Sequence, residues 1–81
     1  MVISVEFFGV QRTITKKDVI KVPLNGLKSA RDVLHYVKKQ YPELPIDDGA
    51  VLITVNHVAA SPDMALKPHD TVCFVPGIGG G

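Results

Sequence analysis

The sequence predicts an α+β fold in which a mixed sheet of four to five strands packs on one main helix. Strand-like runs lie at both ends of the chain, and a single segment between them places its apolar residues at helical spacing. The chain has 81 residues, of which 46% are hydrophobic and 21% are charged. This length and composition indicate one small globular domain.

The first strand is predicted over residues 2–8, where apolar and polar residues alternate. Residues 3, 5 and 7 share an apolar face, whereas Phe8 belongs by alternation to the opposite face. Residues 9–15 are expected to form a turn or loop. A second strand is predicted over residues 16–23. It ends at Pro23, because proline has no N–H to donate to a strand ladder. Two consecutive strands with a short connection favour a hairpin.

The helix is predicted to begin after Ser29, which is a good N-cap residue, and Asp32 three positions later suggests a short-armed capping box. One apolar stripe follows at helical spacing and is expected to face the core. It consists of Ala30, Val33, Leu34, Val37 and Tyr41. Pro42 stops the helix, because proline has no N–H to donate.

Two further strands and a short extended piece are predicted in the second half of the chain. A loop over residues 42–50 leads into a strand over residues 51–55. A tight turn at residues 56–57 is followed by the short extended piece, residues 58–60. A second loop, residues 62–70, then leads into the last strand, residues 71–75. The apolar run over residues 51–55 predicts a well-buried strand. Pro76 closes the last strand.

A folded domain over residues 1–76 is therefore followed by a tail over residues 77–81, which contains four glycines and is predicted to be flexible. Five extended residues reach about 16–18 Å, which is enough to enter a neighbouring protein's cleft. Glycines without side chains also let the tail thread a narrow channel. The predicted working part is the terminal pair, Gly80 and Gly81.

The carboxylate of Gly81 is a poor electrophile until an enzyme adenylates it with ATP. A sulfide or persulfide can then displace AMP and leave a thiocarboxylate, which is a sulfur donor. An amine can instead displace AMP and form an isopeptide bond. The tail therefore fits a sulfur carrier or a protein modifier, and a third interpretation is a non-covalent binding module with an idle tail.

Composition argues against several other classes of function. The net charge is +1 and no basic stripe with interleaved aromatic residues occurs, so nothing indicates nucleic-acid binding. The N-terminus lacks the features of a signal peptide and no apolar stretch approaches membrane-spanning length, which favours the cytoplasm and no membrane contact. The single cysteine, Cys73, excludes an intrachain disulfide. His35, His57 and His69 show no metal-ligand spacing, so no metal site is predicted.

Several short motifs occur in a specific order along nearly the whole chain. They are Val5-Glu6-Phe7-Phe8 with Arg12, Ser29-Ala30-Arg31-Asp32 through Tyr41-Pro42, Val55-Asn56, Leu66-Lys67, Asp70 with Val72, and Pro76-Gly77-Ile78-Gly79-Gly80-Gly81. In this order they resemble the MoaD/ThiS family of ubiquitin-like sulfur carriers, and most of all the small subunits of molybdopterin synthase. The resemblance implies a ubiquitin-like β-grasp fold with a flexible Gly-Gly tail.

The resemblance also implies that Gly81 carries a thiocarboxylate and that two partners exist. One is a MoeB-like adenylyltransferase, which uses the ATP, so no cofactor is expected on this chain. The other is a MoaE-like large subunit, which receives the tail and passes sulfur into the dithiolene of the molybdenum cofactor. The chain alone would catalyse nothing. A ThiS-like carrier for thiazole synthesis is the alternative, because the tail is richer in glycine than the usual small-subunit ending.

In the family the first and last strands lie side by side, and their outer face docks the partners. Phe8, Cys73 and Val75 are therefore expected to form an exposed apolar patch unless a loop covers them. The residues predicted to contact partners are Phe8, Arg12, Lys67, Val75, Pro76, Gly77, Ile78 and Gly79. Cys73 is interpreted as a small hydrophobic residue rather than a nucleophile. His57 and His69 stand at positions where the family often has glycine.

Overall fold

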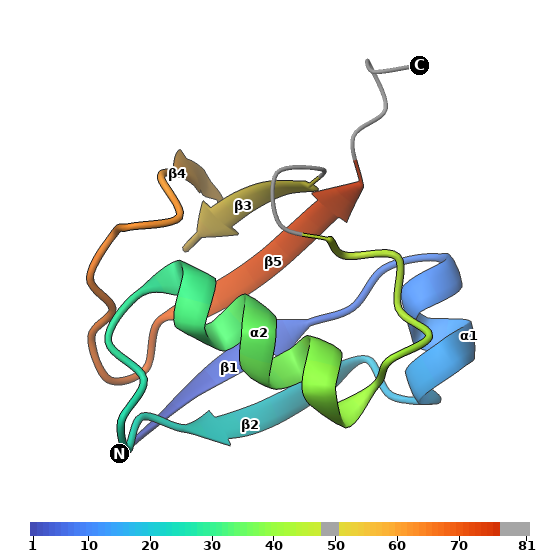
Figure 1. Cartoon of the computed structure of the whole chain (residues 1–81), viewed down its shortest axis with the longest axis horizontal. Coiled ribbons are helices and arrows are strands. Elements are labelled where there is room, and N and C mark those ends of the chain that lie inside the picture. The colour runs from blue at the N-terminus through green and yellow to red at the C-terminus, as the bar shows by residue number, and fades with distance from the viewer. Residues whose placement is uncertain (48–50, 77–81) are drawn as a thin grey trace.

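The computed structural model describes residues 1–47 and 51–76. In chain order its elements are β1 (Val2–Glu6), α1 (Val10–Thr15), β2 (Val19–Pro23), α2 (Ala30–Gln40), β3 (Val51–Val55), β4 (Val58–Ala60) and β5 (Thr71–Pro76) (Figure 1). The predicted α+β class is confirmed. The predicted tail over residues 77–81 lies outside the described residues.

The five strands form one mixed sheet in the order β2-β1-β5-β3-β4. Strand β1 pairs antiparallel with β2 and parallel with β5, and β3 pairs antiparallel with both β5 and β4. Strands from opposite ends of the chain are therefore neighbours in the middle of the sheet. Helix α2 crosses one face of this sheet (Figure 1). The arrangement is the ubiquitin-like β-grasp.

The hydrophobic core lies between α2 and the face of the sheet that it covers. The buried side chains of α2 are Ala30, Val33, Leu34 and Val37, and those of the sheet are Ile3, Val5, Val22, Ile53, Val55, Val72 and Phe74. The alternation predicted for the first and last strands is confirmed. The residues that face α2 are Ile3 and Val5 in β1, and Val72 and Phe74 in β5. No helix of the described residues is long and apolar enough to cross a membrane.

Helix α2 begins with the capping box that its sequence predicts. The hydroxyl of Ser29 accepts a hydrogen bond from the Asp32 N–H at 3.3 Å. The Asp32 carboxylate accepts in return from the N–H groups of Ser29 at 3.1 Å and Lys28 at 2.9 Å. The last helical residue is Gln40, just before the predicted stop at Pro42. The Ser29 hydroxyl and the Asp32 carboxylate thus accept from N–H groups that have no acceptor within the helix.

The loop predicted at residues 9–15 is wrong, because residues Val10–Thr15 form the short helix α1. Gly9, with φ 52° and ψ −122°, turns the chain sharply into this helix. Lys16 ends it in a left-handed conformation, and its N–H donates to the Arg12 carbonyl at 2.7 Å. Six residues are too few for an apolar period to show in the sequence. The neighbouring strands are shorter than predicted, ending at Glu6 and beginning at Val19.

Strand β3 is less buried than its apolar run suggests. Ile53 and Val55 are buried against α2, but Leu52 is 50% exposed. The reason is that helix α2 covers only one face of the sheet, so alternate residues of β3 face away from the core (Figure 1). A continuous apolar run does not distinguish this case from a strand buried on both faces.

Candidate functional site

Strand β5 carries the chain to the point where the predicted tail begins. Its residues Val75 and Pro76 pair with Leu52 and Val51 of β3, so the backbone is held in the sheet up to residue 76. The predictions for Gly77, Ile78, Gly79, Gly80 and Gly81 lie outside the described residues and stay predictions. The starting position of the tail is nevertheless fixed by the sheet.

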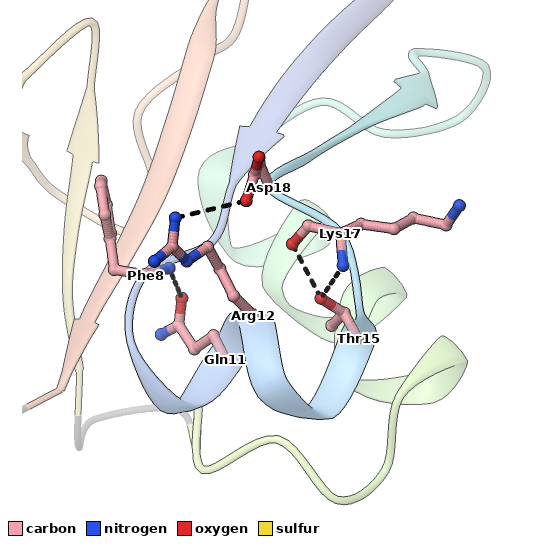
Figure 2. A network of polar contacts seen from close by, with 6 residues as sticks. All are labelled: Phe8, Gln11, Arg12, Thr15, Lys17 and Asp18. Atoms are coloured by element: carbon pink, nitrogen blue, oxygen red, sulfur yellow. Dashed lines mark hydrogen bonds and ion pairs between the residues drawn. The ribbon is translucent and has the colours of Figure 1, made fainter.

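A buried amide secures the same end of β5 from its other side. The side chain of Gln11 is almost fully buried, and its Nε2 donates to the Phe74 carbonyl at 2.7 Å. Its Oε1 accepts from the Phe8 N–H at 3.2 Å (Figure 2). The last residue of β1 that pairs with β5 is Glu6, so beyond it the Gln11 side chain provides the hydrogen bond to β5. No local pattern in the sequence points to this role of Gln11.

Three apolar side chains that are at least partly exposed come from the same end of β3, of β5 and of the segment that follows β1, and we call them the apolar patch. They are Phe8, Leu52 and Val75. Phe8 is 51% exposed and Val75 is half-buried. Leu52 and Val75 lie directly opposite each other on β3 and β5, and the Phe8 ring points away from α1 (Figure 2). The predicted exposure of Phe8 is confirmed, whereas Leu52 was not predicted to be exposed.

Cys73 is buried, so the expectation that it is exposed is wrong and it does not belong to the apolar patch. Only 2% of the residue is exposed, although it lies on the outer face of β5. Its Sγ donates to Glu6 Oε1 at 3.4 Å. Burial raises the pKa of the Cys73 thiol above its ordinary value, and the neighbouring Glu6 carboxylate raises it further. A thiol kept protonated in this way is a weak nucleophile, which agrees with the interpretation from sequence.

Arg12 lies on α1, one turn after Phe8, and its side chain is exposed. Its Nη1 is 3.4 Å from Asp18 Oδ1, and both side chains are more than half exposed (Figure 2). An ion pair in such a setting contributes little, about 0–1 kcal/mol. The guanidinium can therefore exchange Asp18 for an acidic group on a partner at small cost.

Lys67 lies at the other end of the strands from the apolar patch. Its N–H donates to Asp70 Oδ2 at 2.8 Å in the loop before β5, and the Asp70 carbonyl accepts from the Ser4 N–H. Because β1 and β5 are parallel, this loop and Val75 are separated by the length of β5, about 13 Å from Thr71 onward. The structure therefore brings Phe8, Arg12 and Val75 to one end of the sheet and leaves Lys67 apart.

The comparison with protein families decides the identity of this fold. A family model described as the ThiS family matches residues 5–81. The chain belongs to the ThiS family. The match begins at residue 5, within β1, covers every described element after it and runs through the terminal glycines. A comparison with curated protein sequences gave no match.

Solved structures similar to this ThiS-family chain include archaeal and bacterial proteins. A Pyrococcus furiosus protein, provisionally assigned as molybdopterin converting factor subunit 1, is 26% identical with a TM-score of 0.80, covering 95% of this chain and 98% of that one. Small archaeal modifier protein 1 from Haloferax volcanii is 20% identical with a TM-score of 0.80 and full coverage of both chains. The complex of subunits 1 and 2 of the Helicobacter pylori molybdopterin-converting factor contains a chain that is 21% identical, with a TM-score of 0.65 and full coverage of both.

Proposed function

We propose that this ThiS-family chain is a sulfur carrier whose Gly81 carboxylate is adenylated and then converted to a thiocarboxylate. The observation that carries the proposal is that the family match runs to residue 81, through both terminal glycines. The carboxylate attacks the α-phosphate of ATP and releases pyrophosphate, which gives an acyl adenylate. Hydrosulfide then attacks the carbonyl carbon and expels AMP. A partner enzyme binds the ATP, and this chain supplies the carboxylate.

The folded body presents the tail beside a docking surface. Val75 belongs to the apolar patch and directly precedes Pro76, the last residue of β5 and the residue before the tail. A partner that covers Phe8, Leu52 and Val75 therefore meets the start of the tail at the edge of its own contact surface. The Gln11 bond to Phe74 and the β3 pairing hold this start in place. Arg12 adds a positive charge at the same end of the molecule.

The specific role that we propose is the small subunit of molybdopterin synthase. The support is the full-length similarity to the Pyrococcus furiosus protein and to a chain of the Helicobacter pylori complex of subunits 1 and 2. In this role the activating partner is a MoeB-like adenylyltransferase and the receiving partner is a MoaE-like large subunit. Sulfur passes from Gly81 to a pterin precursor held by the large subunit. The reactions take place in the cytoplasm, and the chain alone catalyses none of them.

Two alternative roles use the same activated tail. A protein modifier joins Gly81 to lysine side chains, and the fold shared with small archaeal modifier protein 1 makes this role compatible with the body. A ThiS-like carrier makes the same thiocarboxylate but delivers sulfur to thiazole synthesis. The three roles differ in the nucleophile or acceptor that meets the tail, and not in the structure of the described residues.

The decisive experiment combines the untagged chain with a MoeB-like adenylyltransferase, ATP and sulfide, and records its intact mass. We expect a mass gain equal to the exchange of one oxygen for one sulfur. The gain should be absent without ATP and absent when Gly81 is deleted. An unchanged mass, with an enzyme that is active on its own carrier, would rule out the carrier role with that enzyme class.

The acceptor is decided by a second measurement on the thiocarboxylate form. Incubation with a MoaE-like subunit and a pterin precursor should return the tail to its carboxylate form and place sulfur on the pterin. Retention of the thiocarboxylate there, with turnover by a thiazole synthase, would assign the ThiS-like role. Conjugates of high mass in the native host, lost on deletion of Gly81, would assign the modifier role.

A further inference from the structure

Three potential metal ligands from three different elements meet on the outer face of the sheet. They are the Glu6 carboxylate of β1, the Cys73 thiol of β5 and the imidazole of His57 in the β3–β4 turn. Their ligand atoms all lie within 4.8 Å of one another. This is the one group of this kind among the described residues. The carrier chemistry proposed for Gly81 does not involve it.

The sheet fixes the backbone of two of these ligands. Glu6 and Cys73 are paired neighbours on the parallel strands β1 and β5, and Cys73 is paired on its other side with Thr54 of β3. Side chains at paired positions share a face of the sheet. Their donor atoms already touch, because Cys73 Sγ donates to Glu6 Oε1.

The third ligand stands in a turn that would favour another residue. Asn56 and His57 are the two loop residues of the β3–β4 hairpin, with φ 54° and 70°. Hairpin turns with two positive φ angles strongly prefer Asn-Gly, so His57 occupies the position that suits glycine. A histidine here is strained, yet its side chain reaches back over Glu6 and Cys73.

Neighbouring polar contacts hold this turn against the sheet. The Asn56 side chain accepts from the Thr71 N–H at 2.9 Å and donates to Asp70 Oδ1 at 3.0 Å. The Asn56 N–H donates to the Thr71 carbonyl at 2.7 Å. The turn that carries His57 is therefore tied to the start of β5, and these contacts of Asn56 hold the His57 backbone in place.

We propose that Glu6, His57 and Cys73 bind a Zn²⁺ ion. One carboxylate oxygen, one imidazole nitrogen and one thiolate sulfur are ligands that zinc accepts in a tetrahedral site, and a thiolate favours zinc over magnesium or calcium. Zinc bond lengths place such ligand atoms about 3.4–3.6 Å apart, so a closure of roughly 1 Å by side-chain rotation completes the site. The fourth position is open to water.

Binding replaces a proton with the metal ion. The Cys73 thiol gives up its proton and its bond to Glu6, and both atoms then coordinate zinc, so one proton is released for each ion bound. The ion would also lie close to the apolar patch, because Cys73 and Val75 are successive outward positions of β5, about 7 Å apart. A partner docked on the patch would then reach the open fourth position.

The test is a titration of the untagged, unactivated chain with Co²⁺ and then Zn²⁺. We expect Co²⁺ to produce a thiolate-to-cobalt charge-transfer band in the near ultraviolet, and Zn²⁺ to abolish it by displacement. Zn²⁺ should also raise the melting temperature of the chain. His57→Gly should weaken zinc binding at least 10-fold while the metal-free variant becomes more stable, because glycine relieves the strain of the turn.

The matched control is His69→Asn. His69 is also an exposed histidine with a positive φ, 73°, but it is not one of the three ligands. This variant should bind zinc as the unchanged chain does. Absence of the charge-transfer band, or His57→Gly binding Zn²⁺ as tightly as the unchanged chain, would overturn the site. An equal loss of affinity in His69→Asn would overturn it as well.

Discussion

The side-chain amide of Gln11 donates a hydrogen bond of 2.7 Å to the carbonyl of Phe74, 63 positions later in the chain. This bond replaces the backbone pairing with β1 for the end of β5, because β1 ends at Glu6 and the chain then enters α1. One buried side chain thereby connects the first helix, the last strand and, through the Phe8 N–H, the residue at the edge of the apolar patch.

Replacing Gln11 by Met should lower the free energy of unfolding by about 1–3 kcal/mol. Met has a similar length but cannot donate or accept as the amide does, so the Phe74 carbonyl and the Phe8 N–H lose their partner. Urea unfolding measures the change. Gln40→Met at the exposed end of α2 is the control and should stay within about 0.5 kcal/mol. Equal losses in both variants would contradict the role assigned to the buried amide.

Replacing Gly9 by Ala should destabilise the fold by about 1–3 kcal/mol. A Cβ on Gly9 would meet nothing within 4 Å, so the whole cost comes from φ 52° and ψ −122°, where side chains are disfavoured. Thermal unfolding checks the prediction. Thr13→Ala, an exposed position of the same helix, should leave stability nearly unchanged because alanine is a strong helix former. A neutral Gly9→Ala would show that α1 can begin with another backbone conformation.

Replacing Phe8 by Ser should weaken binding to the activating enzyme at least 10-fold, while the free energy of unfolding falls by only about 1 kcal/mol. The ring is half exposed, so the core does not depend on it, whereas a partner would bury it. Calorimetric titration with the adenylyltransferase measures the affinity. Met64→Ser, which removes another exposed apolar side chain in the loop before β5, should leave the affinity unchanged. Equal weakening by both variants would argue against the apolar patch as the docking surface.

The capping box should make stability depend on pH in the acid range. Hydrogen bonds from the N–H groups of Lys28 and Ser29 hold the pKa of Asp32 below its ordinary value of about 3.9. The stabilisation is therefore complete above about pH 4 and is lost as the pH falls through the lowered pKa. Asp32→Asn should be less stable than the unchanged chain at pH 7, and the difference should shrink as the carboxylate is protonated. Urea unfolding from pH 7 to about pH 2 gives the comparison.

Ser29→Ala is the control for this pH dependence. It removes the hydroxyl that caps the Asp32 N–H and should cost about 1 kcal/mol at every pH. The carboxylate and its two main donors remain, so the acid-range dependence should persist. A pH profile for Ser29→Ala as flat as that of Asp32→Asn would contradict the assignment of the dependence to the carboxylate.

The order of strands and helix could be predicted because each element has a local signal. Alternation defined the inner faces of β1 and β5, and the Ser29 cap with its apolar stripe defined α2. Helix α1 escaped prediction because six residues held by a glycine and one buried amide leave no period to detect. The exposure of Leu52 could not be predicted, because an apolar run does not reveal that only one face of the sheet is covered.

The candidate site was predictable in part. Phe8 could be placed outward by continuing the alternation of residues 2–6, although the strand itself ends at Glu6. The chemistry of the terminal glycines stays a prediction from the sequence. The burial of Cys73 and its hydrogen bond to Glu6, 67 positions away, could not be inferred, because they depend on how β5 is placed in the sheet. The meeting of Glu6 and Cys73 with His57 likewise depends on the register of three strands and on one turn.

The sequence by itself determined the α+β class, the helix with its cap and the inward faces of the strands, and it predicts that the terminal glycine pair carries a carboxylate for activation. These follow from local periods, capping residues and the chemistry of the chain end, which need no distant partner. Only the tertiary structure decided that β1 and β5 are neighbours through Glu6 and Cys73, that Gln11 completes the edge of β5, and that Leu52 joins Phe8 and Val75. Those facts are pairings between distant segments, and a pairing is fixed by the packing of the whole core rather than by either segment alone.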